Sequence, residues 1–338
     1  MRKTPSTAPI YIGGVDRSGK STLAGFLTSH SSMAIPPVGT NLWTYFYRRF
    51  GNLGVSANRD KALDAVLRYD RVRALDPNVE RIRTEFLEGP ANYERLFALP
   101  LIDYAERAGK RRWGAQTGLI ERYADELFDA YPGAAIVHMI RDPRDRFTAV
   151  RPRAEAGRGG IGAATARWRY SAELADRNRR RHRGRYLVVR FEDLVLETER
   201  TLRVVCEFLG ERYEADMVQM REAPSRHERL ISQRGSSVDE GLLSPQFVGI
   251  FREQLTDSEL RFIEISARSQ MEQFGYELQR TTMAWQESIH FALRTWPAHR
   301  FRMSLWRWSE AMHKSAPRFA GPRVDERLMA PQTTEMSE

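Results

Sequence analysis

A glycine-rich stretch between an apolar run and a helical pattern constrains this chain more than any other feature. The run PIYIGGV predicts a short β-strand that ends in glycines, and KSTLAGFLTSH after it has helical character. Gly14 and Gly19 allow the backbone of the turn to approach a ligand closely. Backbone N–H groups and the positive end of the helix dipole then converge, so the turn predicts an oxyanion-binding site.

This turn has two interpretations, which differ in the group that it binds. The nucleotide-binding pattern G-x-x-x-x-G-K-S is completed by Gly14, Gly19, Lys20 and Ser21. In that interpretation Lys20 binds phosphates and Ser21 binds Mg²⁺. The inner letters RSGKST are also similar to the phosphosulfate loop of sulfotransferases. The rest of the chain has to distinguish the two.

A second anion-binding group is expected at the end of another strand. The run AAIVHMI is typical of a buried parallel strand, and it ends at Arg141. A magnesium-dependent enzyme would favour an acidic residue there, but Asp142 comes only after the arginine. Because ligands bind at the carboxyl ends of parallel strands, Arg141 is placed for a second phosphate.

Apolar runs and helical patterns alternate along most of the 338 residues, of which 41% are hydrophobic. This alternation predicts an α/β fold, a three-layer sandwich with a central parallel sheet flanked by helices. We expect this domain to cover residues 8–280, with a helical insertion at about 40–110 that forms the acceptor pocket.

The C-terminal part has a different pattern. Residues 281–315 predict an amphipathic helical extension, which Pro297 interrupts, and residues 316–338 are expected to be disordered. The first apolar stripe consists of Trp285, Ile289, Leu293 and Trp296, and the second of Phe301, Leu305, Trp308 and Met312. We expect these stripes to pack on the parent domain or a partner subunit. The alternative is peripheral membrane contact, in which the stripes, with Arg300, Arg302, Arg307 and Lys314 around the second, lie on a membrane interface.

Charge and cysteine content restrict the partners and the compartment. The 53 Lys plus Arg exceed the 44 Asp plus Glu, so the net charge is +9 and anionic ligands are favoured. The run RNRRRHRGR is expected to be a solvated helix end and not a nucleic-acid site. The single cysteine, Cys206, excludes an intrachain disulfide and is expected in a buried helix position. We expect a cytoplasmic protein, with the inner face of the membrane as the alternative location.

Four segments, taken in order, carry a resemblance to a known family. They are YIGGVDRSGKSTL, RRWGAQTG, YPGAAIVHMIRDPRD and YLVVRFEDLVLETERTLRVVCEFLG. Together they resemble the bacterial branch of the PAPS-dependent sulfotransferases over roughly residues 9–280. The resemblance implies a sheet related to that of nucleotide kinases, and transfer of a sulfuryl group from 3′-phosphoadenosine 5′-phosphosulfate to a hydroxyl or amine.

The resemblance also implies roles for individual residues. The 5′-phosphosulfate would be bound by Arg17, Ser18, Gly19, Lys20, Ser21 and Thr22, with Arg17 and Lys20 as catalytic residues, and no metal would be required. Arg141 would bind the 3′-phosphate. The family's second 3′-phosphate ligand, a serine, falls on Ala149, and Thr148 beside it is the candidate substitute. Further departures from the family pattern are Lys20 for threonine, Gln116 for lysine, Gly118 for proline and Phe191 for tyrosine.

The function expected first is therefore sulfuryl transfer to a hydroxyl acceptor, with a carbohydrate or glycolipid favoured. An ATP-dependent kinase for a small molecule or nucleoside, using Lys20 and Ser21, is the alternative, followed by a non-enzymatic nucleotide- or nucleic-acid-binding protein. The general base stays unassigned among His30, Glu121, His138 and His182. Asp193 is expected to cap a turn, and Asp145 to pair with Arg144 or Arg141.

Overall fold

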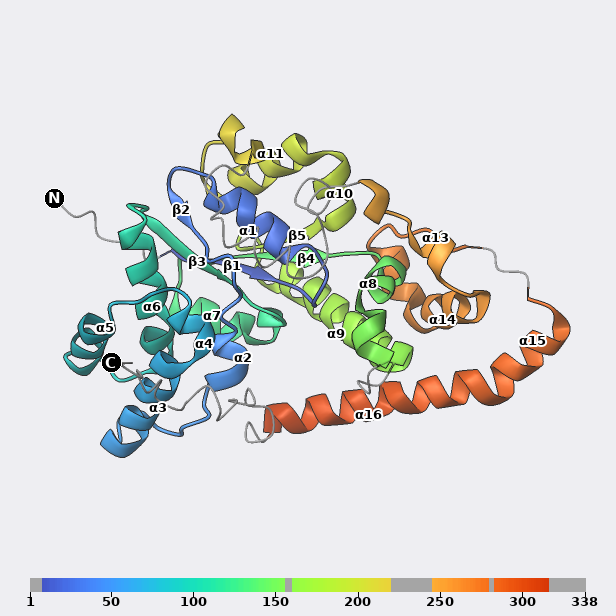
Figure 1. The fold of residues 1–338 in the computed structure, drawn as a ribbon, viewed down its shortest axis with the longest axis horizontal. Coiled ribbons are helices and arrows are strands. Elements are labelled where there is room, and N and C mark those ends of the chain that lie inside the picture. The colour runs from blue at the N-terminus through green and yellow to red at the C-terminus, as the bar shows by residue number, and fades with distance from the viewer. Residues whose placement is uncertain (1–7, 156–159, 220–244, 280–282, 316–338) are drawn as a thin grey trace, which may run out of the picture.

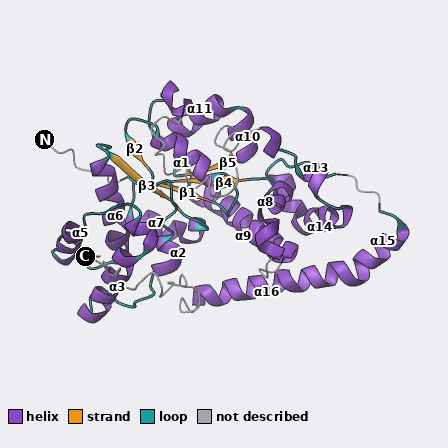
Figure 2. Cartoon of the chain, in the orientation of Figure 1, coloured by secondary structure: helices purple, strands orange, loops and turns teal. Residues whose placement is uncertain are grey.

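A parallel sheet lies at the centre of the molecule (Figures 1 and 2). The computed structural model describes residues 8–155, 160–219, 245–279 and 283–315. The five strands have the order β2-β3-β1-β4-β5. They are β1 (Ile10–Gly13), β2 (Met33–Ala34), β3 (Arg112–Gln116), β4 (Ala135–Ile140) and β5 (Tyr186–Arg190). The apolar runs PIYIGGV and AAIVHMI predict β1 and β4, whereas β2 is too short to produce a pattern.

Strand β1 occupies the middle of the sheet, between β3 and β4. Ile10 of β1 is opposite Gly114 of β3 on one side and Ala135 of β4 on the other. A Cβ atom at Gly114 would lie 2.4 Å from the Ile10 carbonyl oxygen, so only glycine fits there. Every residue of β1 and β4 is buried, which explains their continuous apolar sequences.

Helices cover both faces of the sheet, so the predicted three-layer sandwich is confirmed. One face is covered by α1 (Lys20–Thr28), α10 (Phe191–Leu196) and α11 (Thr198–Leu209). The opposite face is covered by α6 (Tyr93–Arg107), α7 (Ala124–Ala130) and α9 (Gly160–Arg181). Cys206 of α11 is buried between α11 and the sheet, as predicted.

A group of helices follows β2, where the sequence predicts a helical insertion. It consists of α2 (Leu42–Phe46), α3 (Ser56–Arg68), α4 (Asp70–Arg73) and α5 (Val79–Leu87), and it precedes α6. Asn78 and Asn92 begin α5 and α6, and their side chains accept hydrogen bonds from the backbone of Arg81 and Arg95. This group shares one apolar core with β3 and α7.

Six further elements complete the described part of the domain. They are η1 (Ile120–Tyr123), α8 (Pro143–Glu155), η2 (Ala215–Gln219), η3 (Pro245–Phe247), α13 (Phe251–Gln254) and α14 (Asp257–Gln273). The capping box that the sequence predicts at the start of α14 is confirmed, because Thr256 and Glu259 exchange side-chain and backbone hydrogen bonds.

The C-terminal helices form a long arm along one edge of the molecule (Figure 1). They are α15 (Trp285–His290), the π-helical segment η4 (Phe291–Thr295) and α16 (Trp296–Ser315). The chain stays helical through Pro297, but the α-helical pattern is interrupted directly before it by η4, so the interruption predicted near this proline takes the form of a π-helical segment. The predicted tail, residues 316–338, lies outside the described residues.

The face of α16 that packs on α9 is not the predicted stripe. Met303 and Glu310 are buried, and Trp306 contacts Tyr170 of α9. The second predicted stripe, Phe301, Leu305, Trp308 and Met312, is exposed. The expectation that it packs on the parent domain is therefore wrong. None of the helices in the described ranges has the length and apolar character that crossing a bilayer requires.

Candidate active site

The turn between β1 and α1 is built around residues with positive φ. Gly14 has φ 111°, Arg17 has φ 64° and Gly19 has φ 90°. A Cβ atom at Gly14 would lie 2.2 Å from the Met139 carbonyl oxygen, and one at Gly19 would lie 2.4 Å from the Phe191 ring. The two glycines are therefore required by close packing as well as by backbone conformation.

The N-terminus of α1 is free to bind an anion. Gly19 is its N-cap, no side chain caps the helix, and its first turn contains no acidic residue. The first N–H groups of a helix have no acceptor within the helix, so those of Lys20, Ser21 and Thr22 are available to a ligand. This geometry supports the predicted oxyanion site.

Lys20 points back into its own turn. Its Nζ donates hydrogen bonds to the carbonyl oxygens of Gly14 (2.8 Å) and Val15 (2.5 Å). Burial lowers the pKa of Lys20 to about 8, although the negative charges of Asp16 and Glu121 raise it. The ammonium group thus lies inside the turn, and its charge depends on pH near neutrality.

The other predicted residues of the turn divide into two groups. Ser18 is buried and donates to the Val15 carbonyl oxygen at 2.8 Å, so it stabilises the turn itself. Thr22 is buried at the start of α1, whereas the Arg17 and Ser21 side chains are exposed. The Ser21 hydroxyl donates to Gln116 Oε1 at 3.0 Å, which joins the turn to the end of β3.

Arg141, at the end of β4, lies against the same turn. Its Nη1 is 3.4 Å from the Arg17 carbonyl oxygen, and its Nη2 donates to the Phe247 carbonyl oxygen at 2.7 Å. The guanidinium carbon lies 4.6 Å from the centre of the Phe191 ring. Its Nε is buried and has no hydrogen-bond partner among the described residues. The structure thus brings together the two anion-binding groups that the sequence predicts separately.

Thr148, the predicted substitute for the missing serine, bonds within its own helix. Its hydroxyl donates to the Asp145 carbonyl oxygen at 2.8 Å, so it would have to rotate before donating to a phosphate. Asp145 also differs from the expectation, because its carboxylate accepts the backbone N–H groups of Gly249 (2.7 Å) and Phe251 (2.9 Å) instead of pairing with a neighbouring arginine. The pairing predicted for Asp145 is wrong.

Arginines after β4 form buried ion pairs that support the site. Arg144 binds both carboxylate oxygens of Asp142 and also Glu264 at 2.5 Å. Arg146 binds the side chain (2.8 Å) and the carbonyl oxygen (3.0 Å) of Asp16 in the turn. Burial alone would raise the pKa of Asp16, but Arg146 and Arg167 hold it well below its usual value. The sequence does not indicate the pairs with Glu264 and Asp16, because these partners are 120 and 130 positions away in the chain.

A buried polar network lies directly beneath the turn. Glu121 of η1 accepts the Gly14 N–H at 3.1 Å through Oε2 and the Ser171 hydroxyl through Oε1. Ser171 also contacts His138 Nε2 at 3.3 Å, and His138 Nδ1 is 2.7 Å from the Tyr186 hydroxyl. Burial lowers the pKa of His138. Glu121 and His138 therefore stabilise the turn from inside.

The remaining base candidates lie elsewhere. His30 follows the far end of α1 and contacts the Arg212 carbonyl oxygen at 2.8 Å. His182 contacts Asp125 at 2.7 Å, beside the arginine-rich end of α9. Arg179 and Arg180 in that end pair with Asp176, as a solvated helix end would. Of the four candidates, Glu121 is the one that bonds to the turn.

Glu192, and not Asp193, is the structural residue of the segment after β5. Asp193 is exposed and no side chain caps α10, so its predicted capping role is wrong. Glu192 is buried and accepts the Asp142 N–H at 2.9 Å and the Tyr276 hydroxyl at 3.2 Å. Burial raises the pKa of Glu192 to about 7.

Comparisons with known proteins identify the family and the fold of this chain. The sequence profile of the sulfotransferase family matches residues 9–215. The sulfotransferase domain of the Synechococcus PCC 7002 olefin synthase has 19% identity and a TM-score of 0.55, covering 82% of this chain and 97% of that domain. The sulfotransferase domain of the curacin biosynthetic pathway has 14% identity and a TM-score of 0.53, covering 82% and 100%. No curated protein sequence matches the chain. The family profile spans more than half of the sequence, and the two structures share the fold. This chain belongs to the sulfotransferase family.

Proposed function

We propose that this sulfotransferase uses 3′-phosphoadenosine 5′-phosphosulfate as its donor and a hydroxyl group as its acceptor. The observation that carries the proposal is the contact between Arg141 and the turn that holds Lys20. Two separate cationic groups at adjacent strand ends suit a ligand with two anionic ends. The uncapped amides of α1 and the unpartnered Nε of Arg141 are donors that fit these ends.

The chain's own residues would act mainly by position and charge. When bound, the donor supplies the sulfuryl group and a nucleotide leaving group. The first amides of α1 then stabilise the charge that develops on the leaving oxygen, and Lys20 adds positive charge from inside the turn. Arg17 is placed on the exposed side of the turn. Glu121 acts as a positioning residue, because its carboxylate is already occupied by Gly14 and Ser171.

The acceptor would enter beside Ser21, between the sheet and the helical insertion. Gln116 bonds both Ser21 and the Pro37 carbonyl oxygen, which fixes the segment after β2 against the turn. A pocket of about 350 Å³ lies between the insertion and α7, and its aromatic and planar polar groups support a carbohydrate or glycolipid acceptor, because they suit sugar hydroxyls. It is lined by Tyr47, Arg48, Asn92, Glu94, Glu126, Asp129 and Ala130.

The proposal keeps the boundaries and location that the sequence predicts. The catalytic domain covers residues 8–280, the helical extension covers 281–315, and the location is the cytoplasm. Contact with the inner face of the membrane would be made through α15 and α16.

Thermal stabilisation tests the donor assignment. Ligand binding to the native state raises the melting temperature, so 3′-phosphoadenosine 5′-phosphate should stabilise the protein in the presence of a metal chelator. Mg-ATP should have little effect. Stabilisation by Mg-ATP alone would contradict the proposal and favour the kinase alternative.

A further inference from the structure

The C-terminal arm leaves a long apolar surface exposed. Residues of an α-helix are about 100° apart, so the four apolar positions from Phe301 to Met312 lie together, opposite Met303. The outer apolar face, as we call this surface, consists of Phe301 (68% exposed), Leu305 (53%), Trp308 (63%) and Met312 (42%). Trp285 (70%), Ile289 (48%) and Leu293 (73%) of α15 and η4 add further exposed apolar groups on the same arm. Extended apolar patches of this kind mark interaction sites on soluble proteins.

The opposite face of α16 is firmly packed, so the outer apolar face is not needed for the fold. Glu310 pairs with Arg122 of η1 at 2.5 Å. A Cβ atom at Gly162 of α9 would lie 2.3 Å from the His299 carbonyl oxygen, which shows how closely the two helices approach. Helix α16 is thus held in place with its second apolar face turned outward.

Charges along α16 favour an anionic surface as the occupant. Arg300, Arg302 and Arg307 are exposed on its flanks. Glu310 is the single acidic residue in the sequence of α16, and it is buried against Arg122. A second copy of the chain docked on this face would bring two arginine rows together, which like-charge repulsion disfavours.

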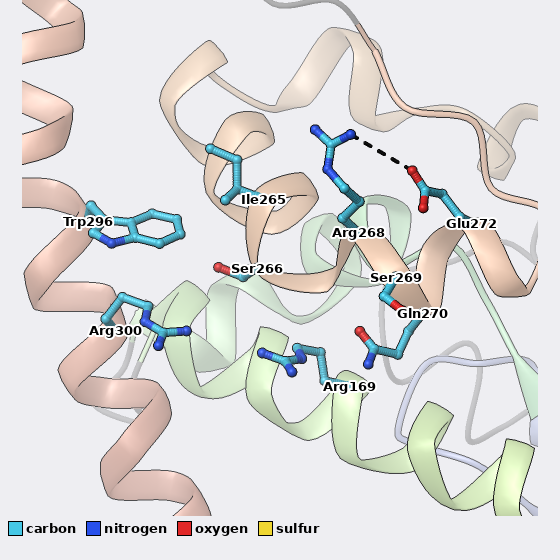
Figure 3. Close-up of a pocket in the computed structure, with 9 residues that line it drawn as sticks. All are labelled: Arg169, Ile265, Ser266, Arg268, Ser269, Gln270, Glu272, Trp296 and Arg300. Carbon is cyan, nitrogen blue, oxygen red and sulfur yellow. Dashed lines mark ion pairs between the residues drawn. The ribbon is translucent and has the colours of Figure 1, made fainter.

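One flank also carries a pocket suited to phosphate. The pocket has a volume of about 490 Å³. Figure 3 shows Arg300 of α16 and Arg169 of α9 pointing into it, with Trp296 beside Arg300 and with Glu272 paired to Arg268 at the opposite side. Ser266 of α14 lines it, is only 7% exposed, and its hydroxyl has no hydrogen-bond partner among the described residues. Guanidinium and hydroxyl donors of this kind bind phosphate oxygens.

We propose that the outer apolar face docks the protein onto an anionic phospholipid surface, with Arg300 and Arg302 against lipid phosphates. The tryptophans and leucines enter the interface between head groups and acyl chains, while the arginines extend to the head groups. This proposal does not depend on sulfuryl transfer, because it concerns residues outside the candidate active site.

Sedimentation with vesicles tests the proposal on the full chain. Wild-type protein should sediment with vesicles of phosphatidylglycerol and phosphatidylcholine, and less with phosphatidylcholine alone. The double variant Leu305→Glu/Trp308→Glu should bind the anionic vesicles about tenfold more weakly or worse. Arg300→Gln should reduce binding less, by removing one charge. Val204→Glu is the control, since Val204 (49% exposed) is close in exposure to Leu305 (53%) but lies on α11, across the molecule (Figure 1).

Three outcomes would overturn the proposal. Wild-type protein would remain in the supernatant with anionic vesicles, or the double variant would sediment as well as Val204→Glu. Alternatively, sedimentation velocity without lipid would show a dimer that the double variant converts to a monomer, which would assign the face to a second copy. Melting temperatures of the variants close to that of the wild type would confirm that each one is folded.

Discussion

Arg141 Nη1 lies 3.4 Å from the carbonyl oxygen of Arg17, although the two residues are 124 positions apart. The contact follows from the sheet order, because β1 and β4 are neighbours and both end at the same edge. The connection that follows β1 leads to β2 on one side of the sheet, and the connection that follows β4 leads to β5 on the other side. In open parallel sheets, ligands bind between two such strands. A ligand at this edge therefore meets both residues.

Replacing Arg141 should affect only ligands with a 3′-phosphate. We expect Arg141→Ala to weaken binding of 3′-phosphoadenosine 5′-phosphate by about 2 kcal/mol, since a charge-assisted hydrogen-bond donor is lost. Binding of adenosine 5′-phosphosulfate, which lacks that phosphate, should change little. Calorimetric titration of both ligands measures the difference, with Arg203→Ala on the exposed side of α11 as the control. Equal losses for both ligands would contradict the assignment.

The charge of Lys20 should govern the alkaline side of the pH profile. The charged form is active and burial lowers the pKa of Lys20 to about 8, so kcat/KM should fall as pH rises above about 8. Lys20→Arg should move this fall in kcat/KM, the alkaline limb of the profile, to higher pH, because a guanidinium stays charged. Lys20→Ala should lose on the order of 10²-fold in rate. An alkaline limb that is unchanged in Lys20→Arg would show that another group titrates.

Glu121 should act through Lys20 and the turn. Its negative charge raises the pKa of Lys20, so Glu121→Gln should move the alkaline limb of kcat/KM to lower pH. Loss of a charged acceptor for Gly14 should also weaken nucleotide binding about tenfold. Ser171→Ala is the control, because it removes the hydroxyl contact and keeps the carboxylate. A limb that moves equally in both variants would indicate a general packing effect.

Glu192 should make stability depend on pH near neutrality. Its pKa is raised from 4.5 to about 7 by burial, so the folded protein binds the proton more tightly than the unfolded chain does. The contribution of Glu192 to the free energy of unfolding should therefore decline by about 3 kcal/mol as pH rises from 4.5 to about 7. Urea unfolding of wild type and Glu192→Gln across that range measures the decline as their difference. Asp193→Asn, at an exposed neighbouring position, should show no such trend.

Local patterns in the sequence were sufficient for the central architecture. Buried parallel strands produce continuous apolar runs, and Gly14 and Gly19 belong to the local pattern G-x-x-x-x-G-K-S. The role of Arg141 was also accessible, because its position at the end of β4 depends only on the strand that precedes it. These features are determined by neighbours in the chain.

The supporting contacts were not accessible in the same way. Glu121 meets Gly14 across 107 positions, and Asp145 meets Gly249 across 104. Their partners are selected by the tertiary fold, and no spacing in the sequence indicates them. Similarly, helix α16 has apolar residues on two opposite faces, and periodicity alone does not show which face α9 covers.

The Phe191 ring contacts both Gly19 and the guanidinium of Arg141. One rigid, uncharged group thus lies against the helix N-terminus and the arginine at the same time. Rigidity at this point means that selectivity is geometric: a molecule is accepted when the separation of its own charged ends matches the separation set by the ring. A shorter or longer dianion would satisfy one end and leave the other unbound.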